Sequence, residues 1–201
     1  MNVLLTGGAG YIGSHAALSL LDSGHDVHII DNLSTGNETL IPKNAKFTNC
    51  NINDDMVISD LIQSNKFDLL MHFAGFIQVE ESVKNPEKYF ENNTDNAIKL
   101  FNICKKNGLK NIVFSSTAAA YGSVNENKLI DENTNLNPQN PYAESKIKTE
   151  KFLLKNQDDF KFIILRYFNV AGADKNLRSG QISKNSTHLI KILSEVVLGK
   201  R

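Results

Sequence analysis

A tyrosine and a lysine at positions 142 and 146 have the residue types and the spacing of a proton-transfer pair. The stretch reads YAESK and follows Pro141 directly. Proline is favoured in the first turn of a helix, and a spacing of four then places Tyr142 and Lys146 on one face. One cation about 4 Å from a phenol, at an effective dielectric of about 20, contributes about 4 kcal/mol, which would lower a tyrosine pKa by about three units.

The same five residues could also be an ordinary helix turn near an ordinary charge, because short motifs arise by chance. Two neighbouring features favour the catalytic interpretation. Three consecutive hydroxyl residues, Ser115, Ser116 and Thr117, end an apolar run, and ligands of open α/β sheets bind outside such strand ends. The second feature is a glycine-rich loop at the start of the chain, which would place a cofactor nearby.

The segment TGGAGYIGSH follows a short apolar run and opens a helical pattern. Gly8, Gly10 and Gly13 satisfy G-x-G-x-x-G, while Gly7, Gly10 and Gly13 satisfy the related G-x-x-G-x-x-G. Such glycines allow a tight turn and a close approach of a pyrophosphate to the N–H groups of a helix N-terminus. A glycine triplet alone is weak evidence, but here it has the required strand before it and helix after it.

Asp31 stands 23 residues after Gly8 at the end of the second apolar run, where an acid can receive the ribose hydroxyls of a dinucleotide. The next six residues, NLSTGN, hold no cation. A 2′-phosphate would meet the carboxylate without a counter-charge, so NAD is favoured over NADP. The alternative is a turn-forming Asp-Asn pair after a strand.

Apolar runs alternate with helical patterns along the chain, which predicts a doubly wound, Rossmann-type α/β fold. The runs are near-continuously apolar, which indicates parallel strands covered on both faces. We expect strands at 2–6, 26–31, 46–51, 67–74, 111–117 and 161–168, helices at 11–24, 86–108 and 141–157, and long irregular segments at 122–141 and 172–186.

The composition is that of an ordinary globular protein, with 22 basic and 22 acidic residues among 201. Neutral charge gives no electrostatic reason to expect nucleic acid or a membrane surface as partner, and no apolar run approaches a membrane span. Cys50 and Cys104 are expected to be free thiols in a cytoplasmic protein. His25 and His28 would point to opposite faces of a strand, so we expect no metal site.

Six segments, TGGAGYIGSH, DNLSTG, HFAG, SSTAAAYG, PYAESK and RYFNVAGA, resemble the extended short-chain dehydrogenase/reductases, and among them most closely the UDP-galactose (UDP-glucose) 4-epimerases. The resemblance runs through the whole chain. It implies tightly held NAD, a UDP-sugar substrate, and a homodimer paired through the helices near 86–107 and 141–157. It also implies an NAD-binding domain over residues 1–171 and the beginning of a substrate domain over 172–201, in a family that normally continues well beyond that length.

The resemblance implies residue roles position by position. Tyr142 would be the base and acid at the sugar 4-hydroxyl, Lys146 would tune it, and Thr117 would hydrogen-bond the same hydroxyl. The cofactor would be held by Tyr142, Lys146, Gly7, Gly10, Tyr11, Ile12, Gly13, Asp31, Asn32, Leu33, Ser34, Thr35, Gly36, Asn51, Ile52, Phe73, Ala74, Gly75, Asn92, Ser115 and Phe168. The UDP-sugar would meet Thr117, Tyr142, Asn169, Thr187, His188 and Leu189.

Two positions depart from the family pattern. Asn51 stands where some relatives have an acid, and Ile77 stands where many have a lysine, so we leave Ile77 out of the site. Two alternative functions stay open: a UDP-sugar decarboxylase of the same family and a non-catalytic NAD-binding module. A 4,6-dehydratase is disfavoured, because Ala118 and Ala119 stand where those enzymes have an acidic pair that donates a proton.

A final helical pattern, STHLIKILSEVVLGKR, carries apolar residues at spacings of three and four. We expect Ser186 or Thr187 to cap it. Its apolar stripe must be covered by a partner, fold against the sheet, or stay exposed.

Overall fold

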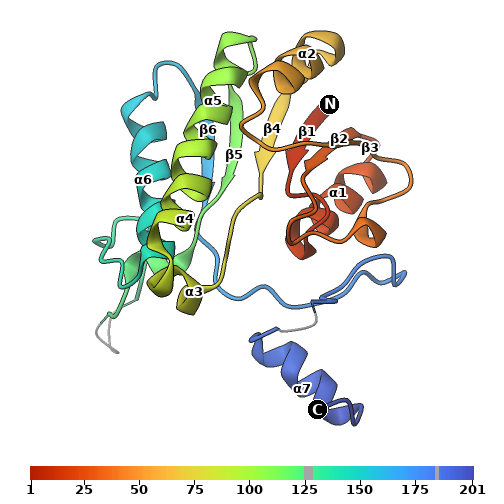
Figure 1. The fold of residues 1–201 in the computed structure, drawn as a ribbon, viewed down its shortest axis with the longest axis vertical. Helices are drawn as coiled ribbons and strands as arrows, with labels where there is room; N and C mark the ends of the chain where they lie inside the picture. The colour runs from red at the N-terminus through yellow and green to blue at the C-terminus, as the bar shows by residue number, and fades with distance from the viewer. Residues whose placement is uncertain (125–128, 184–185) are drawn as a thin grey trace.

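The computed structural model describes residues 1–124, 129–183 and 186–201. Its centre is a six-stranded sheet in the order β3-β2-β1-β4-β5-β6, with every pair parallel (Figure 1). The strands are β1 (Asn2–Thr6), β2 (Asp26–Asp31), β3 (Lys46–Asn49), β4 (Leu69–His72), β5 (Asn111–Ser115) and β6 (Lys161–Leu165). The strand order reverses between β1 and β4, which is where doubly wound sheets bind ligands.

All six predicted strands are present, but four of them end earlier than their apolar runs. β4, for example, stops at His72, and Phe73 to Gly75 leave the sheet to line a cleft at its carboxyl edge. Tyr167 does the same after β6. These residues are apolar or aromatic because they face a cavity rather than a neighbouring strand.

One face of the sheet is covered by the helices α2 (Asp55–Asn65), α5 (Asn96–Lys106) and α6 (Pro141–Lys155). Their side chains form the larger core, in which Leu4, Leu70 and Phe114 from the sheet meet Phe101 and Leu153 from the helices. All five are fully buried. This core fixes α6, which carries Tyr142 and Lys146, against β4 and β5.

The opposite face is covered only in part. Helix α1 (Tyr11–Asp22) packs Ala17 on Leu5, Val27 and Ile29. Further along the sheet, Ile163 and Leu165 of β6 are 59% and 36% exposed. The expectation that all strands are covered on both faces is therefore wrong for β6, because none of the described elements packs on that face of the strand.

The helix predicted over 86–108 is divided by a π-helical turn. It consists of α4 (Pro86–Phe90), the turn η2 (Glu91–Asp95) and α5. Its predicted stop is confirmed, since Asn107 caps α5 and Gly108 has φ +85°. The extra residue of a π turn often marks a functional position, and here the turn holds Asn92 and Asn93.

Shorter elements complete the fold: η1 (Glu38–Leu40), α3 (Val79–Lys84) and η3 (Ala118–Tyr121). The predicted irregular segment 122–141 joins η3 to α6, and residues 125–128 of it lie outside the described part. Among the described residues, no helix is long and apolar enough to span a membrane.

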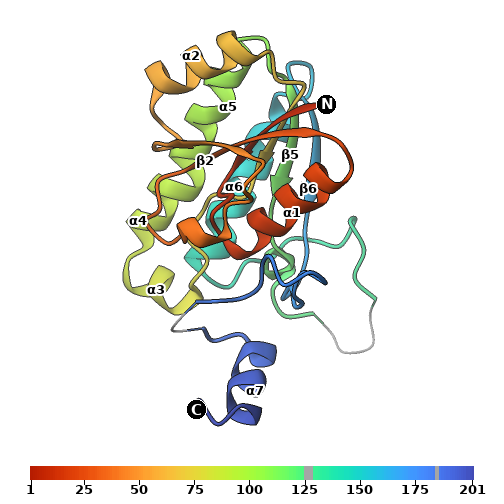
Figure 2. The same cartoon turned by 90° about the vertical axis from the view of Figure 1, so that its right-hand side faces the viewer.

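The last helix, α7 (Leu189–Val197), stands apart from the other elements (Figures 1 and 2). The predicted cap at Ser186 or Thr187 is wrong: His188 is the N-cap residue, and the Ser186 hydroxyl accepts from the His188 N–H instead. The apolar stripe is exposed, with Leu193 at 50% and Val197 at 84%. Of the three outcomes foreseen for it, exposure is the one observed.

Candidate cofactor and active site

A cleft of about 700 Å³ opens at the carboxyl edge of β1, β2, β4 and β5, where the strand order reverses. The glycine loop after β1 forms one wall, and the first two turns of α6 form another. Segments that are distant in sequence therefore meet around one elongated cavity. This is the place that the sequence predicted for a dinucleotide.

Two glycines of the loop, Gly7 and Gly13, are packed too tightly to carry a side chain. Gly7 has φ +74°, and a Cβ on it would lie 2.5 Å from the Ala74 nitrogen. A Cβ on Gly13 would lie 2.2 Å from the Gly7 oxygen. These contacts bring the N-terminus of α1 close to β4 and leave its backbone open to the cleft.

The N-terminus of α1 offers unused donors to an anion. Gly10 is the N-cap, no side chain caps it, and the first turn holds no acidic residue. The first N–H groups of a helix have no intrahelical partner and carry partial positive charge. Those of Tyr11, Ile12 and Gly13 line the cleft, so the loop fits the pyrophosphate of a dinucleotide.

Asp31 joins the loop to the ribose end of the cleft. Its carboxylate accepts hydrogen bonds from the Ala9 N–H at 3.0 Å and the Leu33 N–H at 2.9 Å, and it is 9% exposed. A Cβ on Gly36 would come within 2.8 Å of the same carboxylate. Asp31 therefore organises the turn as well as facing the cavity, so the turn-forming role that the sequence offered as the alternative is present together with its place at the cleft.

Asn51 is held beside this turn by Asn32, whose side-chain amide donates to the Asn51 oxygen at 2.7 Å. An amide oxygen can accept a second hydrogen bond. Asn51 thus keeps an acceptor at the position where some relatives have an acid.

Lys146 is almost fully buried at 3% exposure, and its ammonium donates to the Ser115 carbonyl at 3.0 Å. Burial lowers the pKa of Lys146 to about 8, although the nearby Glu150 carboxylate acts in the opposite direction. The side chain reaches beneath the cleft, since a Cβ on Gly75 would lie 3.2 Å from its nitrogen.

Tyr142 lies in the first turn of α6, as predicted, with Pro141 opening the helix and the Asn140 side chain capping it. Burial raises the pKa of Tyr142, and a hydrogen bond from Thr117 acts to lower it. The ring packs edge-on against Tyr89, with centroids 6.5 Å apart. We expected Lys146 to lower this pKa; instead the lysine ammonium is directed at a carbonyl and burial of the phenol dominates.

Tyr89 supports Tyr142 from a fully buried position that the sequence interpretation missed. Its hydroxyl donates to Glu81 at 2.9 Å and accepts from the Gln78 N–H at 3.1 Å. A tyrosine within a helical apolar pattern gives no signal that distinguishes this role from simple packing.

A buried ion pair fastens α6 to β6. Arg166 donates to Glu150 through Nε and Nη2, the shortest contact being 2.6 Å, and through Nη1 to the Tyr121 hydroxyl at 3.0 Å. The Ser116 hydroxyl also donates to Glu150. The pKa of Arg166 is raised by these bonds. The network positions the helix that carries the Tyr–Lys pair.

Asn93 connects α6 to the loop after β4. Its side chain accepts from the Phe76 N–H at 2.9 Å, donates to the Phe76 carbonyl, and donates to the Ser145 hydroxyl at 3.2 Å. The π turn brings Asn93 inward at 1% exposure while its neighbour Asn92 faces the cleft.

Most of the predicted site residues line the cleft together. They are Gly7, Gly10, Tyr11, Ile12, Gly13, Asp31, Asn32, Ser34, Thr35, Gly36, Asn51, Ile52, Phe73, Ala74, Gly75, Asn92, Ser115, Tyr142, Lys146 and His188. Residues that line it without having been predicted include Phe76, Ile77, Gln78, Glu81, Lys88, Tyr89, Tyr167, Gln181 and Ser183.

A smaller group of predicted residues lies outside the cleft wall. Thr117 is buried behind it, and its oxygen also accepts from the Ala119 N–H. Phe168 is 73% exposed and Asn169 is also exposed. Leu33, Thr187 and Leu189 do not line the cavity either. The family resemblance placed these residues at the site. In this structure Thr117 reaches it through its hydrogen bond to Tyr142, whereas the other five do not line the cavity.

A parallel sheet with a glycine loop at its switch point and a Tyr–Lys pair at the same edge defines a nucleotide-binding protein of the Rossmann class. Comparison with known families narrows this class to one family. Residues 3–200 match the NAD dependent epimerase/dehydratase family, and the chain belongs to that family.

Individual relatives agree with this assignment. A UDP-glucose 4-epimerase of Lactobacillus helveticus is 43% identical and aligns with 99% of this chain and 61% of its own length. The structure of UDP-glucose 4-epimerase from Brucella ovis in complex with NAD has a TM-score of 0.94 at 34% identity, covering 100% of this chain and 62% of that one. That of the Bifidobacterium longum enzyme in complex with NAD⁺ and UDP has a TM-score of 0.91 at 32% identity, covering 100% and 63%. The chain thus spans about three fifths of its relatives' length.

Proposed function

We propose that this chain is the cofactor-binding part of an NAD-dependent UDP-sugar 4-epimerase that interconverts UDP-glucose and UDP-galactose, or their N-acetyl forms. The observation that carries the proposal is the meeting of Tyr142 and Lys146 with the glycine loop in one cleft. NAD and UDP occur in solved structures of relatives with the same fold.

NAD, when bound, would supply a hydride acceptor and donor for C4 of the sugar. Tyr142 would take the proton of the 4-hydroxyl and later return it, while the Thr117 hydroxyl stabilises the phenolate by the hydrogen bond it donates. Lys146 would add positive charge beneath the phenolate and hold the nicotinamide ribose. Because a 4-keto sugar must turn over within the site, the proton-transfer group must stay fixed, and the packing against Tyr89 meets that need.

We propose NAD rather than NADP because of the charges around the ribose end of the cleft. The Asp31 carboxylate is already hydrogen-bonded in place by two N–H groups. Of the residues from Asn32 to Gly36, those that line the cleft carry no charge. A 2′-phosphate there would meet a fixed negative charge.

A UDP-sugar decarboxylase of the same family is the first alternative, and a non-catalytic NAD-binding module is the second. The intact pair of Tyr142 and Lys146, with Thr117 behind it, favours a catalytic protein over the module. Ala118 and Ala119 are uncharged members of η3, which favours epimerisation over dehydration.

The test is to add UDP-galactose to the chain loaded with NAD⁺. The epimerase hypothesis predicts slow growth of the reduced-nicotinamide absorbance without release of carbon dioxide, and UDP-glucose detectable by NMR. NAD retention with no spectral change, both in this chain and in a chimaera completed with the remaining part of a relative's enzyme, would support the binding module. Carbon dioxide release from a UDP-uronic acid would support the decarboxylase.

We propose further that residues 1–171 form the NAD-binding domain and that 172–201 begin a substrate domain. The UDP-sugar would meet Asn169 at the end of the first and Thr187, His188 and Leu189 in the second. Of these, His188 lines the cleft. The proposal predicts weak or absent turnover by the 201 residues alone, because the uracil and diphosphate need further contacts. Equal turnover per bound NAD by this chain and by a relative's full-length enzyme would contradict it.

A homodimer through α4, α5 and α6 is also proposed. Helices α4 and α6 lie side by side, and Lys148 of α6 sits 3.8 Å above the Phe90 ring at their surface. Leu154 is 50% exposed on the same helix. Light scattering that gives a monomer mass at high concentration would contradict the dimer.

We expect a cytoplasmic location, supported by the free thiols of Cys50 and Cys104; localisation by fractionation would test it.

A further inference from the structure

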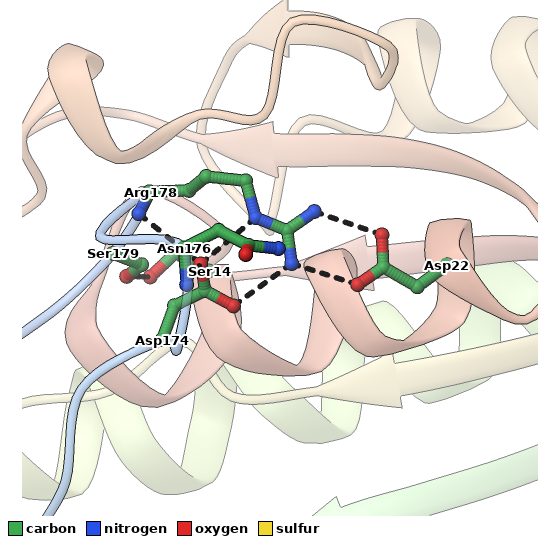
Figure 3. Close-up of polar contacts among 6 residues, drawn as sticks. All are labelled: Ser14, Asp22, Asp174, Asn176, Arg178 and Ser179. Atoms are coloured by element: carbon green, nitrogen blue, oxygen red, sulfur yellow. Dashed lines mark hydrogen bonds and ion pairs between the residues drawn. The ribbon is translucent and has the colours of Figure 1, made fainter.

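An arginine far from the Tyr–Lys pair fastens the segment after β6 to helix α1 (Figure 3). Arg178 donates to both oxygens of Asp22, from Nη1 at 2.8 Å and from Nη2 at 2.7 Å. It also donates to both oxygens of Asp174, from Nε and Nη2 at 2.8 Å each. We call Asp22, Asp174 and Arg178 the arginine clasp. A planar guanidinium matches two carboxylates in a way that an ammonium does not.

Two further hydrogen bonds attach the same segment nearer to the glycine loop. The hydroxyls of Ser14 and Ser179 are buried together, with their oxygens 2.6 Å apart. The Tyr11 hydroxyl donates to the Gly172 carbonyl at 2.6 Å. Residues 172–179 are thus joined to α1 at its first turn, through Tyr11 and Ser14, and at its last turn, through Asp22.

The turn that presents Arg178 is closed on itself. The Asp174 carboxylate accepts from the N–H groups of Asn176 at 3.0 Å and Arg178 at 3.2 Å. The Asp174 N–H donates to the Ser179 carbonyl at 2.9 Å. The hydrogen bonds from Arg178, above all, hold the pKa of Asp174 well below its usual range. Leu177 has φ +58°, a conformation that non-glycine residues rarely adopt, so the clasp also holds a strained backbone in place.

The chain continues from the clasp directly into the cofactor cleft. Gln181 and Ser183, two and four residues after Ser179, line the cavity with Gly10 and Tyr11 of the glycine loop. They follow Ser179, which touches Ser14 in the first turn of α1, and so lie on the side of the cavity next to the glycine loop. The position of this outer wall therefore depends on where the clasp holds residues 174–179.

We propose that Arg178 is a positioning residue that holds Gln181 and Ser183 against the glycine loop and thereby slows the release of a bound dinucleotide. The proposal rests on the proposed NAD-binding function. It differs from that function in its prediction, because it concerns the rate of release and not whether NAD binds. An epimerase that regenerates its cofactor in place has a use for slow release.

The experiment measures NAD release from the 201-residue chain and its variants after loading and rapid desalting. Free NAD⁺ is trapped by alcohol dehydrogenase and ethanol, which report it as reduced nicotinamide. We expect Arg178→Gln to release NAD about tenfold faster with little change in association, because affinity differences between related complexes lie mostly in dissociation. The release rate of Arg178→Lys should fall between those of wild type and Arg178→Gln, because lysine keeps the positive charge but lacks the planar guanidinium that bonds both carboxylates.

Asp22→Asn is the decisive variant. Asp22 is the last residue of α1, at the helix end remote from the glycine loop, so it cannot touch the dinucleotide and can act only through Arg178. An acid at a helix C-terminus opposes the helix dipole, so removing its charge should not weaken the helix itself. If Asp22→Asn releases NAD faster while its urea midpoint is unchanged or higher, the faster release comes from lost positioning of the cleft wall and not from a less stable fold.

Lys105→Gln is the matched control. It removes an ion pair with Asp159 of similar length and exposure, at the amino edge of the sheet and away from the cleft. Its release rate should equal that of the wild type. Release from Arg178→Gln and Asp22→Asn within twofold of wild type would overturn the proposal while leaving NAD binding intact. A wild-type chain that retains no NAD would overturn both proposals together.

Discussion

The buried pair of Glu150 and Arg166 gives the sharpest test of how α6 is held. Glu150 has a side-chain exposure of 1% and Arg166 one of 16%, so water does not reach the carboxylate and reaches the guanidinium only in part. Removing one partner of such a pair typically costs about 3 to 5 kcal/mol, because the other charge stays buried. Glu150→Gln keeps the side-chain volume and one acceptor oxygen. We therefore expect the free energy of unfolding to fall by the lower value of this range, about 3 kcal/mol.

Urea unfolding followed by circular dichroism measures this loss. With an m-value of about 2 kcal/mol/M, the midpoint should fall by about 1.5 M at an unchanged slope. Glu144→Gln is the control, since Glu144 is exposed on the same helix, and it should shift the midpoint by less than about 0.3 M, equivalent to about 0.5 kcal/mol.

A second variant distinguishes loss of the ion pair from loss of packing. The double substitution Glu150→Leu with Arg166→Met replaces both charges by apolar groups, which is often neutral or stabilising. It should be more stable than Glu150→Gln alone. A midpoint shift below about 0.5 M for Glu150→Gln, or a double variant less stable than the single one, would refute the argument that an uncompensated arginine is what destabilises the fold.

Three further predictions concern the site. Tyr142→Phe should keep NAD bound and lower turnover by about 10² to 10⁴-fold, because the ring still packs and the proton acceptor is lost; turnover within threefold of wild type would show that Tyr142 is not the base. Asp31→Ser with Asn32→Arg should shift preference towards NADP, since a carboxylate is removed and a cation added, and an unchanged ratio of the two affinities would contradict the ribose assignment. The third concerns Lys146, whose folded pKa of about 8 lies below its usual value of 10.5. The unfolded chain therefore holds the proton more tightly, and the stability of wild type relative to Lys146→Met should rise between pH 8 and 10.5 by up to about 3 kcal/mol; parallel pH profiles of the two proteins would contradict this.

The positions of the strands and of the cofactor loop could be predicted from local patterns. β1, the glycine loop and α1 form one continuous signal, in which an apolar run, a glycine triplet and a helical period follow one another within 22 residues. Asp31 and the Tyr142–Lys146 pair could be placed because each lies at a fixed offset from an element boundary. The family resemblance then connected these separate signals into one site.

The supporting contacts could not be predicted in the same way, because they join residues distant in sequence. Arg166 meets Glu150 only after β6 pairs with β5 and α6 packs across both. Asn93 is positioned by a π turn, for which the sequence has no distinctive pattern, and Tyr89 lies in α4 directly before that turn. The pKa of Tyr142 was misjudged for a related reason: spacing gives the face of a helix, but the direction of the Lys146 ammonium depends on the Ser115 carbonyl.

The exposed helix α7 has a thermodynamic consequence for the whole chain. The heat capacity change of unfolding reflects apolar surface newly exposed to water, at about 12 to 15 cal/mol/K per residue for packed domains. Leu189 and Val197 are already 67% and 84% exposed when the chain is folded, so the segment adds little to that quantity. A helix of nine residues is also marginal without tertiary contacts. Heating should therefore melt α7 gradually, as a sloping circular dichroism baseline, before the sheet unfolds in one cooperative step with a heat capacity change smaller than the chain length alone would suggest.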